Sequence, residues 1–133
     1  MSAVRIGAQA GMTQREIAAA TGRSQPEVSR LLRFRGTTDL GRRLARNRGK
    51  VRDLAATYRA GNVRVFGSVA RGTNSAQSDI DLLVDWPEGL GLFALSRLES
   101  ELANLLGATV DVVPRGSLRG HLADRVLDEA VPL

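Results

Sequence analysis

The spacing of apolar residues changes at Gly61, and this change limits what the chain can fold into. Before Gly61, apolar residues recur every three or four positions, a period that is typical of helices. Beyond it, the short runs 63–66 and 79–84 have the alternation and the composition of strands. We therefore expect the front of the chain to be helical and a sheet to begin after Gly61.

The segments after these two runs complete an α/β unit. Leucines recur at helical spacing from 92 to 106, and Gly107 is expected to end that helix. Residues 110–113 form a third run with the character of a strand, and the apolar positions from 118 to 126 predict a closing helix. The pattern indicates a small mixed sheet with helices on one side, of the α/β class.

Composition and charge restrict the compartment and the chemistry. The chain has no cysteine, which excludes disulfides and thiolate metal sites and agrees with a reducing cytoplasm. It has neither a signal peptide nor an uncharged apolar run of about 18 residues, so we expect a cytoplasmic protein without membrane contact. Residues 1–61 carry 13 Lys or Arg and 4 Asp or Glu, whereas residues 62–133 carry 6 and 10. A basic front half suits a polyanion such as DNA, and an acidic second half suits a cation.

Two capping boxes mark the starts of two short helices near the front of the chain. Thr13 precedes Glu16 by three residues, Ser24 precedes Glu27 by the same spacing, and Gly22 ends the first helix. With the apolar positions around them, these residues resemble the helix-turn-helix of bacterial repressors. The resemblance implies that four polar residues of the second helix contact DNA in the major groove: Gln25, Ser29, Arg30 and Arg33.

Residues 1–36 are accordingly assigned to a small all-α DNA-binding segment. A helix-turn-helix of this size usually works as a dimer on a near-palindromic operator, so we expect a homodimer. The alternative is a helical hairpin that only packs on the second domain. That domain spans residues 37–133, and its first part, 37–61, is expected to be a long basic bridging helix that ends at Gly61. The run 35–38 is the candidate linker.

Two aspartates share one face of the second predicted strand. Because alternate side chains of a strand point the same way, Asp79 and Asp81 project together while Ile80 and Leu82 point to the core. Carboxylates held this close repel one another, and Mg²⁺ relieves the repulsion by taking their oxygens as ligands. Asp111 alternates in the same way in the third strand and can supply a third carboxylate. The acidic half of the chain therefore contains a candidate metal site.

A turn suited to phosphate follows the first predicted strand directly. Gly67 lets backbone N–H groups approach a phosphate where a β-carbon would interfere, and Ser68 adds a hydroxyl donor. Arg71, expected at the start of a helical turn, has a guanidinium that can bind phosphate oxygens. A Gly-Ser pair alone is usually only a turn, so the interpretation depends on its combination with the aspartates.

That combination resembles the DNA polymerase β-type nucleotidyltransferase superfamily. The matching segments are Phe66-Gly67-Ser68, Asp79-Ile80-Asp81 and Val110-Asp111-Val112, and the run 66–84 looks like the minimal nucleotidyltransferase branch. The resemblance covers residues 40–133 and implies an α+β nucleotidyltransferase fold. It implies that Asp79, Asp81 and Asp111 are catalytic and bind Mg²⁺. A second set is expected to bind ATP through its phosphates: Gly67, Ser68, Arg71 and Ser78.

Proteins of this branch commonly act as antitoxins paired with a HEPN ribonuclease toxin. By this resemblance, we expect the chain to transfer AMP from ATP to a tyrosine of such a toxin and to repress its own operon through the front segment. About seventy residues follow Gly61, which leaves little protein for an acceptor pocket, so the acceptor is expected in a partner protein. The alternative is a DNA-binding regulator whose second domain only binds nucleotide or toxin.

Overall fold

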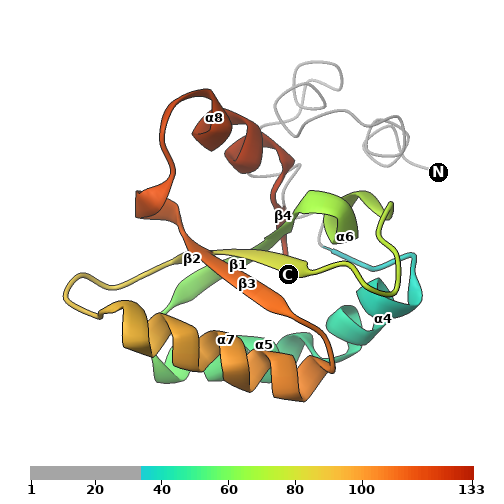
Figure 1. Cartoon of the computed structure of the whole chain (residues 1–133), viewed down its shortest axis with the longest axis horizontal. Coiled ribbons are helices and arrows are strands. Elements are labelled where there is room, and N and C mark those ends of the chain that lie inside the picture. Colours follow the sequence, from blue (N-terminus) through green and yellow to red (C-terminus); the bar gives the residue numbers. More distant parts are fainter. Residues whose placement is uncertain (1–33) are drawn as a thin grey trace.

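Helices cover both faces of a small sheet in the computed structural model, which describes residues 34–133 (Figure 1). Along the chain the elements are α4 (Asp39–Arg46), α5 (Arg48–Thr57), β1 (Gly61–Phe66), α6 (Gly67–Arg71), β2 (Ile80–Asp85), α7 (Leu92–Leu106), β3 (Val110–Pro114), the 3-10 helix η1 (Arg115–Ser117), α8 (Gly120–Glu129) and β4 (Val131–Pro132). None of the helices in this part of the chain has the length and apolar character needed to cross a lipid bilayer. The predicted DNA-contacting residues lie outside the described residues, and their role stays a prediction: Gln25, Ser29, Arg30 and Arg33.

The sheet has four strands in the order β3-β2-β1-β4. Strand β1 runs antiparallel to β2 and β4, whereas β2 and β3 run parallel to each other. The predicted mixed sheet is thereby confirmed. The two-residue strand β4 has no counterpart among the predictions, because so short a segment shows no periodicity.

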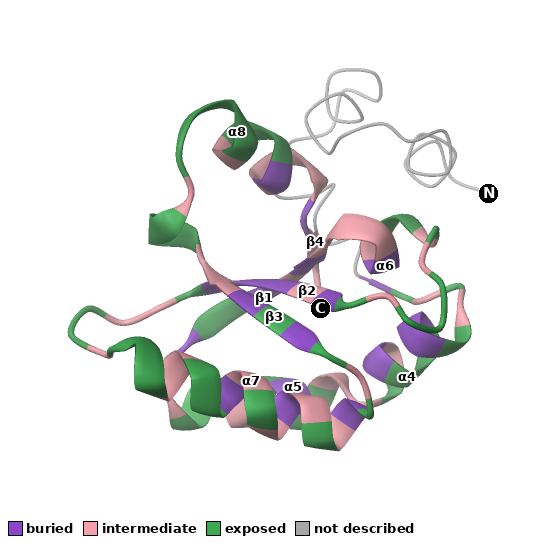
Figure 2. Cartoon of the chain, viewed as in Figure 1, coloured by how far each residue is buried: buried purple, intermediate pink, exposed green. Residues whose placement is uncertain are grey.

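The main core lies between the sheet and the helices α4, α5 and α7 (Figure 2). On β2, the alternate residues Ile80, Leu82 and Val84 are buried on this face. Helix α7 contributes three leucines that are almost completely buried: Leu98, Leu102 and Leu106. Each such side chain stabilises the fold by about 2 kcal/mol relative to an exposed one, so this layer anchors the sheet.

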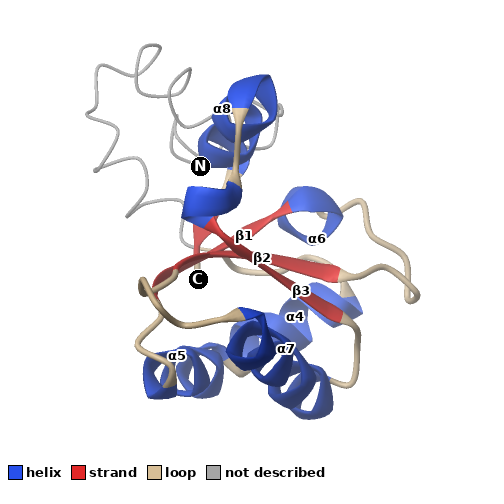
Figure 3. Ribbon diagram, turned by 60° about the vertical axis from the view of Figure 1, so that its left-hand side comes forward, coloured by secondary structure: helices blue, strands red, loops and turns tan. Residues whose placement is uncertain are grey.

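The prediction that all helices lie on one side of the sheet was wrong. Helix α8 lies on the face opposite α5 and α7, and the short helix α6 lies beyond the end of β1 toward that same side (Figure 3). Leu83 points to this second face, where it packs with Val126 and Ala130. The side chains in the middle of β2 are apolar on both faces of the sheet, so other residues have to cover each face. Asp81, two residues before Leu83, shares the face of α8.

The predicted bridging helix is two helices with a break at Asn47. Asn47 has non-helical backbone angles, with a φ of −101° and a ψ of 12°, and its N–H is shared between the carbonyls of Arg43 and Leu44. Helix α5 ends at Thr57, the chain turns through Arg59 with a φ of 58°, and Gly61 is already the first residue of β1. The prediction of one continuous helix that ends at Gly61 was therefore wrong, because the backbone leaves the helical conformation at Asn47 and again after Thr57.

Arginines of this basic region bind backbone carbonyl groups elsewhere in the fold. Arg43 donates to the carbonyl of Leu106 at 3.0 Å, which secures the end of α7. Arg52 donates to the carbonyl of Leu133, beside β4. Phe34, next to the candidate linker, is itself buried in the main core. Part of the positive charge thus serves the architecture of the fold.

Candidate active site

The carboxylates predicted to bind a metal come from two neighbouring strands. Asp81 on β2 and Asp111 on β3 are direct partners in the parallel register, and adjacent strands are roughly 4.8 Å apart. Asp79 immediately precedes β2, which begins at Ile80. Asp79 and Asp111 are exposed, whereas Asp81 is partly buried. The fold therefore brings Asp81 and Asp111 together, with Asp79 at the entrance of the strand.

The surroundings of Asp81 disfavour its negative charge. Burial raises the pKa of Asp81 above its usual value, and the negative charges of Asp111 and Asp79 raise it further. Arg71 acts in the opposite direction, because its positive charge lowers the pKa of Asp81. A cation bound between these carboxylates would remove the repulsion that raises this pKa.

Gly67 is packed directly against Asp81. It is the first residue of α6 and has a φ of +74°, a left-handed conformation that residues with a side chain rarely adopt. A β-carbon at this position would lie 2.3 Å from Oδ2 of Asp81. The glycine is therefore required by the carboxylate and by the turn itself, and not only by the approach of a phosphate, as the sequence suggested.

Arg71 forms an ion pair with a residue of α8, and its charge also acts on Asp81. It is the last residue of α6, so the expectation that it starts a helical turn was wrong; the helix begins at Gly67, directly after β1. Its Nη1 donates to a carboxylate oxygen of Glu129, the last residue of α8, at 3.0 Å. The positive charge of Arg71 also acts on Asp81. Arg71, which the sequence predicts to bind phosphate, is thus held by Glu129 from α8.

The loop between α6 and β2 is held by side-chain hydrogen bonds. The hydroxyl of Ser78 accepts a hydrogen bond from the N–H of Ser75 at 2.9 Å. Thr38, at the start of α4, donates its hydroxyl to the side-chain oxygen of Asn74 at 2.9 Å. Ser78 therefore shapes the loop that leads to Asp79, and its contact with nucleotide stays a prediction.

The donor set of the site fits a hard divalent cation. Asp79, Asp81 and Asp111 offer carboxylate oxygens, the ligands that Mg²⁺ prefers, and Asp81 is the residue whose charge a cation would stabilise. Within residues 34–133, no three acidic or histidine side chains stand close enough together to hold a metal ion by themselves. Phosphate oxygens and water are the further ligands that Mg²⁺ usually takes.

Two glutamates form hydrogen bonds with residues next to or within the candidate site, and no pattern in the sequence predicted these contacts. Glu99 on α7 accepts a hydrogen bond from the N–H of Val112 at 2.8 Å, directly after Asp111 on β3. Glu129 on α8 accepts the hydrogen bond from Arg71. Both occupy polar positions of amphipathic helices, where a glutamate is ordinary, so only the tertiary structure reveals their partners.

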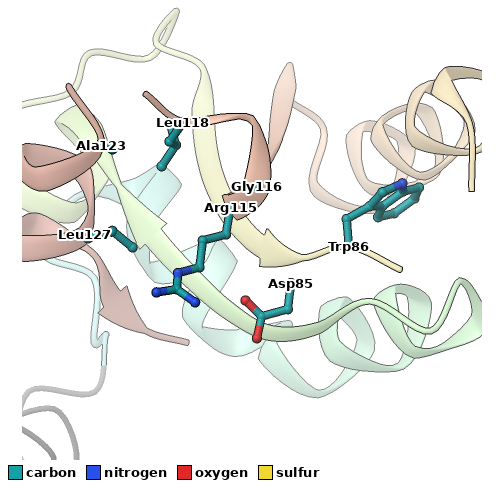
Figure 4. A pocket seen from close by; sticks show the side chains of 7 residues that line it. All are labelled: Asp85, Trp86, Arg115, Gly116, Leu118, Ala123 and Leu127. Atoms are coloured by element: carbon teal, nitrogen blue, oxygen red, sulfur yellow. The ribbon is translucent and has the colours of Figure 1, made fainter. Parts of the chain in front are cut away.

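A cavity of about 390 Å³ lies at the far end of β2 (Figure 4). Its lining combines apolar and charged residues: Asp85, Trp86, Arg115, Gly116, Leu118, Ala123 and Leu127. Asp85 is 3.6 Å from the guanidinium of Arg64. Burial lowers the pKa of Arg64, Asp85 raises it, and Arg115 lowers it again. Because four residues of an extended strand span roughly 13 Å, the cavity is separate from the carboxylates near Asp81.

A family model describes the class of protein that this fold and site define. Residues 48–133 match the nucleotidyltransferase domain, so the chain belongs to the nucleotidyltransferase domain family. The match includes the turn at Gly67 and all three aspartates of the candidate site. The predicted enzyme class, nucleotidyltransferase, is thereby confirmed.

Two similar proteins carry names that refer to protein adenylyltransferase activity. A protein of Methanocaldococcus jannaschii, named as a candidate protein adenylyltransferase, is 48% identical over 67 residues, which are 50% of this chain and 72% of that protein. The protein adenylyltransferase MntA of Thermococcus cleftensis is 39% identical over 80 residues, which are 60% of this chain and 81% of that protein.

Two solved structures have folds similar to that of this chain. A structure described as a minimal nucleotidyltransferase is 46% identical, has a TM-score of 0.65, and is matched over 72% of this chain and 97% of its own. A toxin–antitoxin crystal structure with AMP-PNP is 31% identical, has a TM-score of 0.50, and is matched over 55% of this chain and 60% of its own. The predicted resemblance to minimal nucleotidyltransferases is confirmed by these similarities.

Proposed function

We propose that the chain transfers AMP from ATP to a hydroxyl group of a partner toxin protein, with Mg²⁺ bound by Asp79, Asp81 and Asp111. One observation carries the proposal. Asp81 lies beside Asp111 in the sheet and against Gly67 in a chain of this family, and this supports a site shared by the predicted phosphate turn and the carboxylates. Relatives named protein adenylyltransferases, and a similar toxin–antitoxin structure with AMP-PNP, support the nucleotide and the kind of acceptor.

The transfer forms a bond between the acceptor oxygen and the α-phosphorus of ATP. The bond from that phosphorus to the oxygen bridging the β-phosphorus breaks, and pyrophosphate leaves. Asp111 is exposed and adjacent to Asp81, which suits it to accept the proton of the acceptor hydroxyl. Mg²⁺, when bound, neutralises charge on the phosphate oxygens. The phosphates themselves are bound by four residues: Gly67, Ser68, Arg71 and Ser78.

Labelled ATP tests this function. The chain, its partner toxin, Mg²⁺ and ATP labelled at the α-phosphate should yield labelled toxin. Asp79→Ala and Asp81→Ala should each reduce the rate about 100-fold or more, because the metal ligands act in the transition state. Asp53→Asn, which removes an exposed charge on α5, is the matched control and should react like wild type. Equal labelling by wild type and Asp81→Ala, or none by either, would contradict the proposal.

The acceptor on the toxin is proposed to be a tyrosine of a HEPN ribonuclease, on the basis of the family resemblance. Mass spectrometry of the labelled toxin should place one AMP on a tyrosine, and ribonuclease activity should fall as that AMP accumulates. Replacement of the tyrosine by phenylalanine should abolish labelling. AMP on a serine, threonine or histidine would refute the tyrosine assignment and leave the transfer activity intact.

We further propose that residues 1–36 bind the operator of the chain's own operon as a homodimer. The helix-turn-helix pattern and the excess of positive charge in the front half support this role. Arg30→Ala and Arg33→Ala should abolish DNA binding but not AMP transfer, whereas Asp79→Ala should do the reverse. A monomer on DNA at micromolar concentration would count against the dimer. DNA binding without any transfer would favour the alternative, a regulator that only binds nucleotide or toxin.

A further inference from the structure

The ion pair between Arg71 and Glu129 joins the proposed nucleotide site to the last helix. Nη1 of Arg71 is 3.0 Å from a carboxylate oxygen of Glu129, and both side chains are partly exposed. The two residues are far apart in the sequence, and each ends its helix, α6 or α8. An isolated pair of this exposure stabilises a fold by at most about 1 kcal/mol, so stability alone gives little reason for the contact.

Glu129 is held in place by the residues on either side of it. Val126, one turn earlier, and Ala130, directly after it, are buried against Leu83. The chain then enters β4, which pairs with β1, and the N–H of Leu133 donates to the carbonyl of Val63 at 3.1 Å. The backbone at Glu129 is therefore fixed to the sheet that also carries the carboxylates.

Arg71 can bind a phosphate while it keeps this contact. Its hydrogen bond to Glu129 uses Nη1, and a guanidinium has further N–H donors in a fixed planar arrangement. Arg71 is also one helical turn from Gly67, which packs against Asp81, and its charge acts on that carboxylate. A phosphate bound next to Asp81 would thus find Arg71 already within the site. Glu129 limits the rotamers that the long side chain would otherwise explore.

We propose that Glu129 is a positioning residue that holds the guanidinium of Arg71 ready for the phosphates of ATP. The inference rests on the proposed function, because it assumes that the site binds a nucleotide. The contact with Glu129 should increase the affinity for ATP, because Arg71 then loses its side-chain freedom when the chain folds and not when ATP binds. Freezing one such side chain on binding weakens affinity by about three- to tenfold.

Titration of the full chain with ATP and Mg²⁺, followed by calorimetry, tests the proposal. Glu129→Ala should raise the Kd for ATP about fivefold, and Glu129→Gln, which keeps a hydrogen-bond acceptor, should raise it about twofold. Asp124→Ala is the matched control: it removes a charge from the same helix, and its carboxylate has no hydrogen-bond or ion-pair partner among residues 34–133. The control should bind ATP like wild type.

A double-mutant cycle separates positioning of Arg71 from a general role in folding. In an Arg71→Ala background, loss of Glu129 should have no further effect on the Kd, because Glu129 acts through Arg71. The Tm of Glu129→Ala should stay within about 5 °C of wild type, because the pair stabilises the fold by at most about 1 kcal/mol. An equal effect of Glu129→Ala in both backgrounds, an unchanged Kd, or tighter binding would overturn the proposal. If wild type itself binds no ATP, the proposed function fails, and the inference fails with it.

Discussion

Asp81→Asn is expected to stabilise the metal-free protein while it abolishes AMP transfer. The folded chain keeps Asp81 partly buried, beside Asp111 and near Asp79, and these surroundings raise its pKa. Above this raised pKa the charged carboxylate of Asp81 is repelled by Asp111 and Asp79, and folding has to overcome that repulsion. Asparagine has nearly the same shape and no charge, and therefore removes the repulsion while it fills the same space.

The size of the effect follows from the strand spacing. Two unit charges about 5 Å apart repel by about 0.8 kcal/mol in water and by about 3 kcal/mol at the effective dielectric constant of a protein surface. Asp111 is exposed, so solvent screening keeps the repulsion near the lower figure, and we expect a gain of about 1 kcal/mol. For a chain of this length, that gain raises the Tm by about 3–5 °C.

The advantage of Asp81→Asn should depend on pH. Because the pKa of Asp81 is raised on folding, the folded chain holds this proton more tightly than the unfolded chain does. Wild-type stability therefore falls as the pH rises from the ordinary value of 3.8 through the raised pKa. The variant escapes this loss, so its advantage should grow as the pH rises through the raised pKa of Asp81 and disappear below the ordinary value of 3.8.

Circular dichroism melts in EDTA measure this advantage directly. Wild type, Asp81→Asn and the control Asp53→Asn should be compared from pH 7 downwards, and then at pH 7 with Mg²⁺ and ATP. Ligand should raise the Tm of wild type and of the control but not that of Asp81→Asn. A variant Tm at or below that of wild type in EDTA at pH 7 would refute the electrostatic account of the site.

Three further substitutions test the packing around the site. Gly67→Ala should destabilise the fold by about 1–3 kcal/mol in urea unfolding and abolish transfer, because its β-carbon would strain the turn and displace the carboxylate of Asp81; wild-type behaviour would argue against the contact. Leu83→Ala should cost about 2–4 kcal/mol in the same assay and loosen α8, which raised hydrogen exchange in that helix would report. Glu99→Ala should leave the N–H of Val112 without its partner and cost about 1–3 kcal/mol, and an unchanged urea midpoint would contradict that role.

The sequence predicted the carboxylates and their strands because both depend on local patterns. Because side chains alternate along a strand, Asp81 must lie on the face of the sheet opposite to Ile80 and Leu82. The same rule puts Asp111 on the face opposite to Val110 and Val112. Which strands are neighbours is a matter of topology, and the pairing of Asp81 with Asp111 became certain only with the parallel register. The family motif supplied the grouping that alternation alone could not.

The missed helix on the second face and the missed role of Glu129 both come from contacts between distant segments, whereas the break at Asn47 is local. Leu83 interrupts the alternation of β2 and requires a helix on the second face, but within an apolar run it resembles its neighbours. The break between α4 and α5 falls at Asn47, although Gly49 has the weaker helix propensity. Glu129 has no local signal at all, because its importance depends on Arg71 in another helix.

The two edge strands have a consequence for how another protein can approach. On β3, the N–H of Val112 is occupied by Glu99, and on β4, Pro132 has no N–H and its carbonyl accepts from Phe34. Proteins usually protect edge strands with charged side chains and prolines. These residues prevent another chain from pairing with the edge, which would lead to aggregation. A partner that extends the sheet by pairing its own strand would have to displace these groups first. Recognition through side chains, presented by helices or loops above the carboxylates, requires no such displacement.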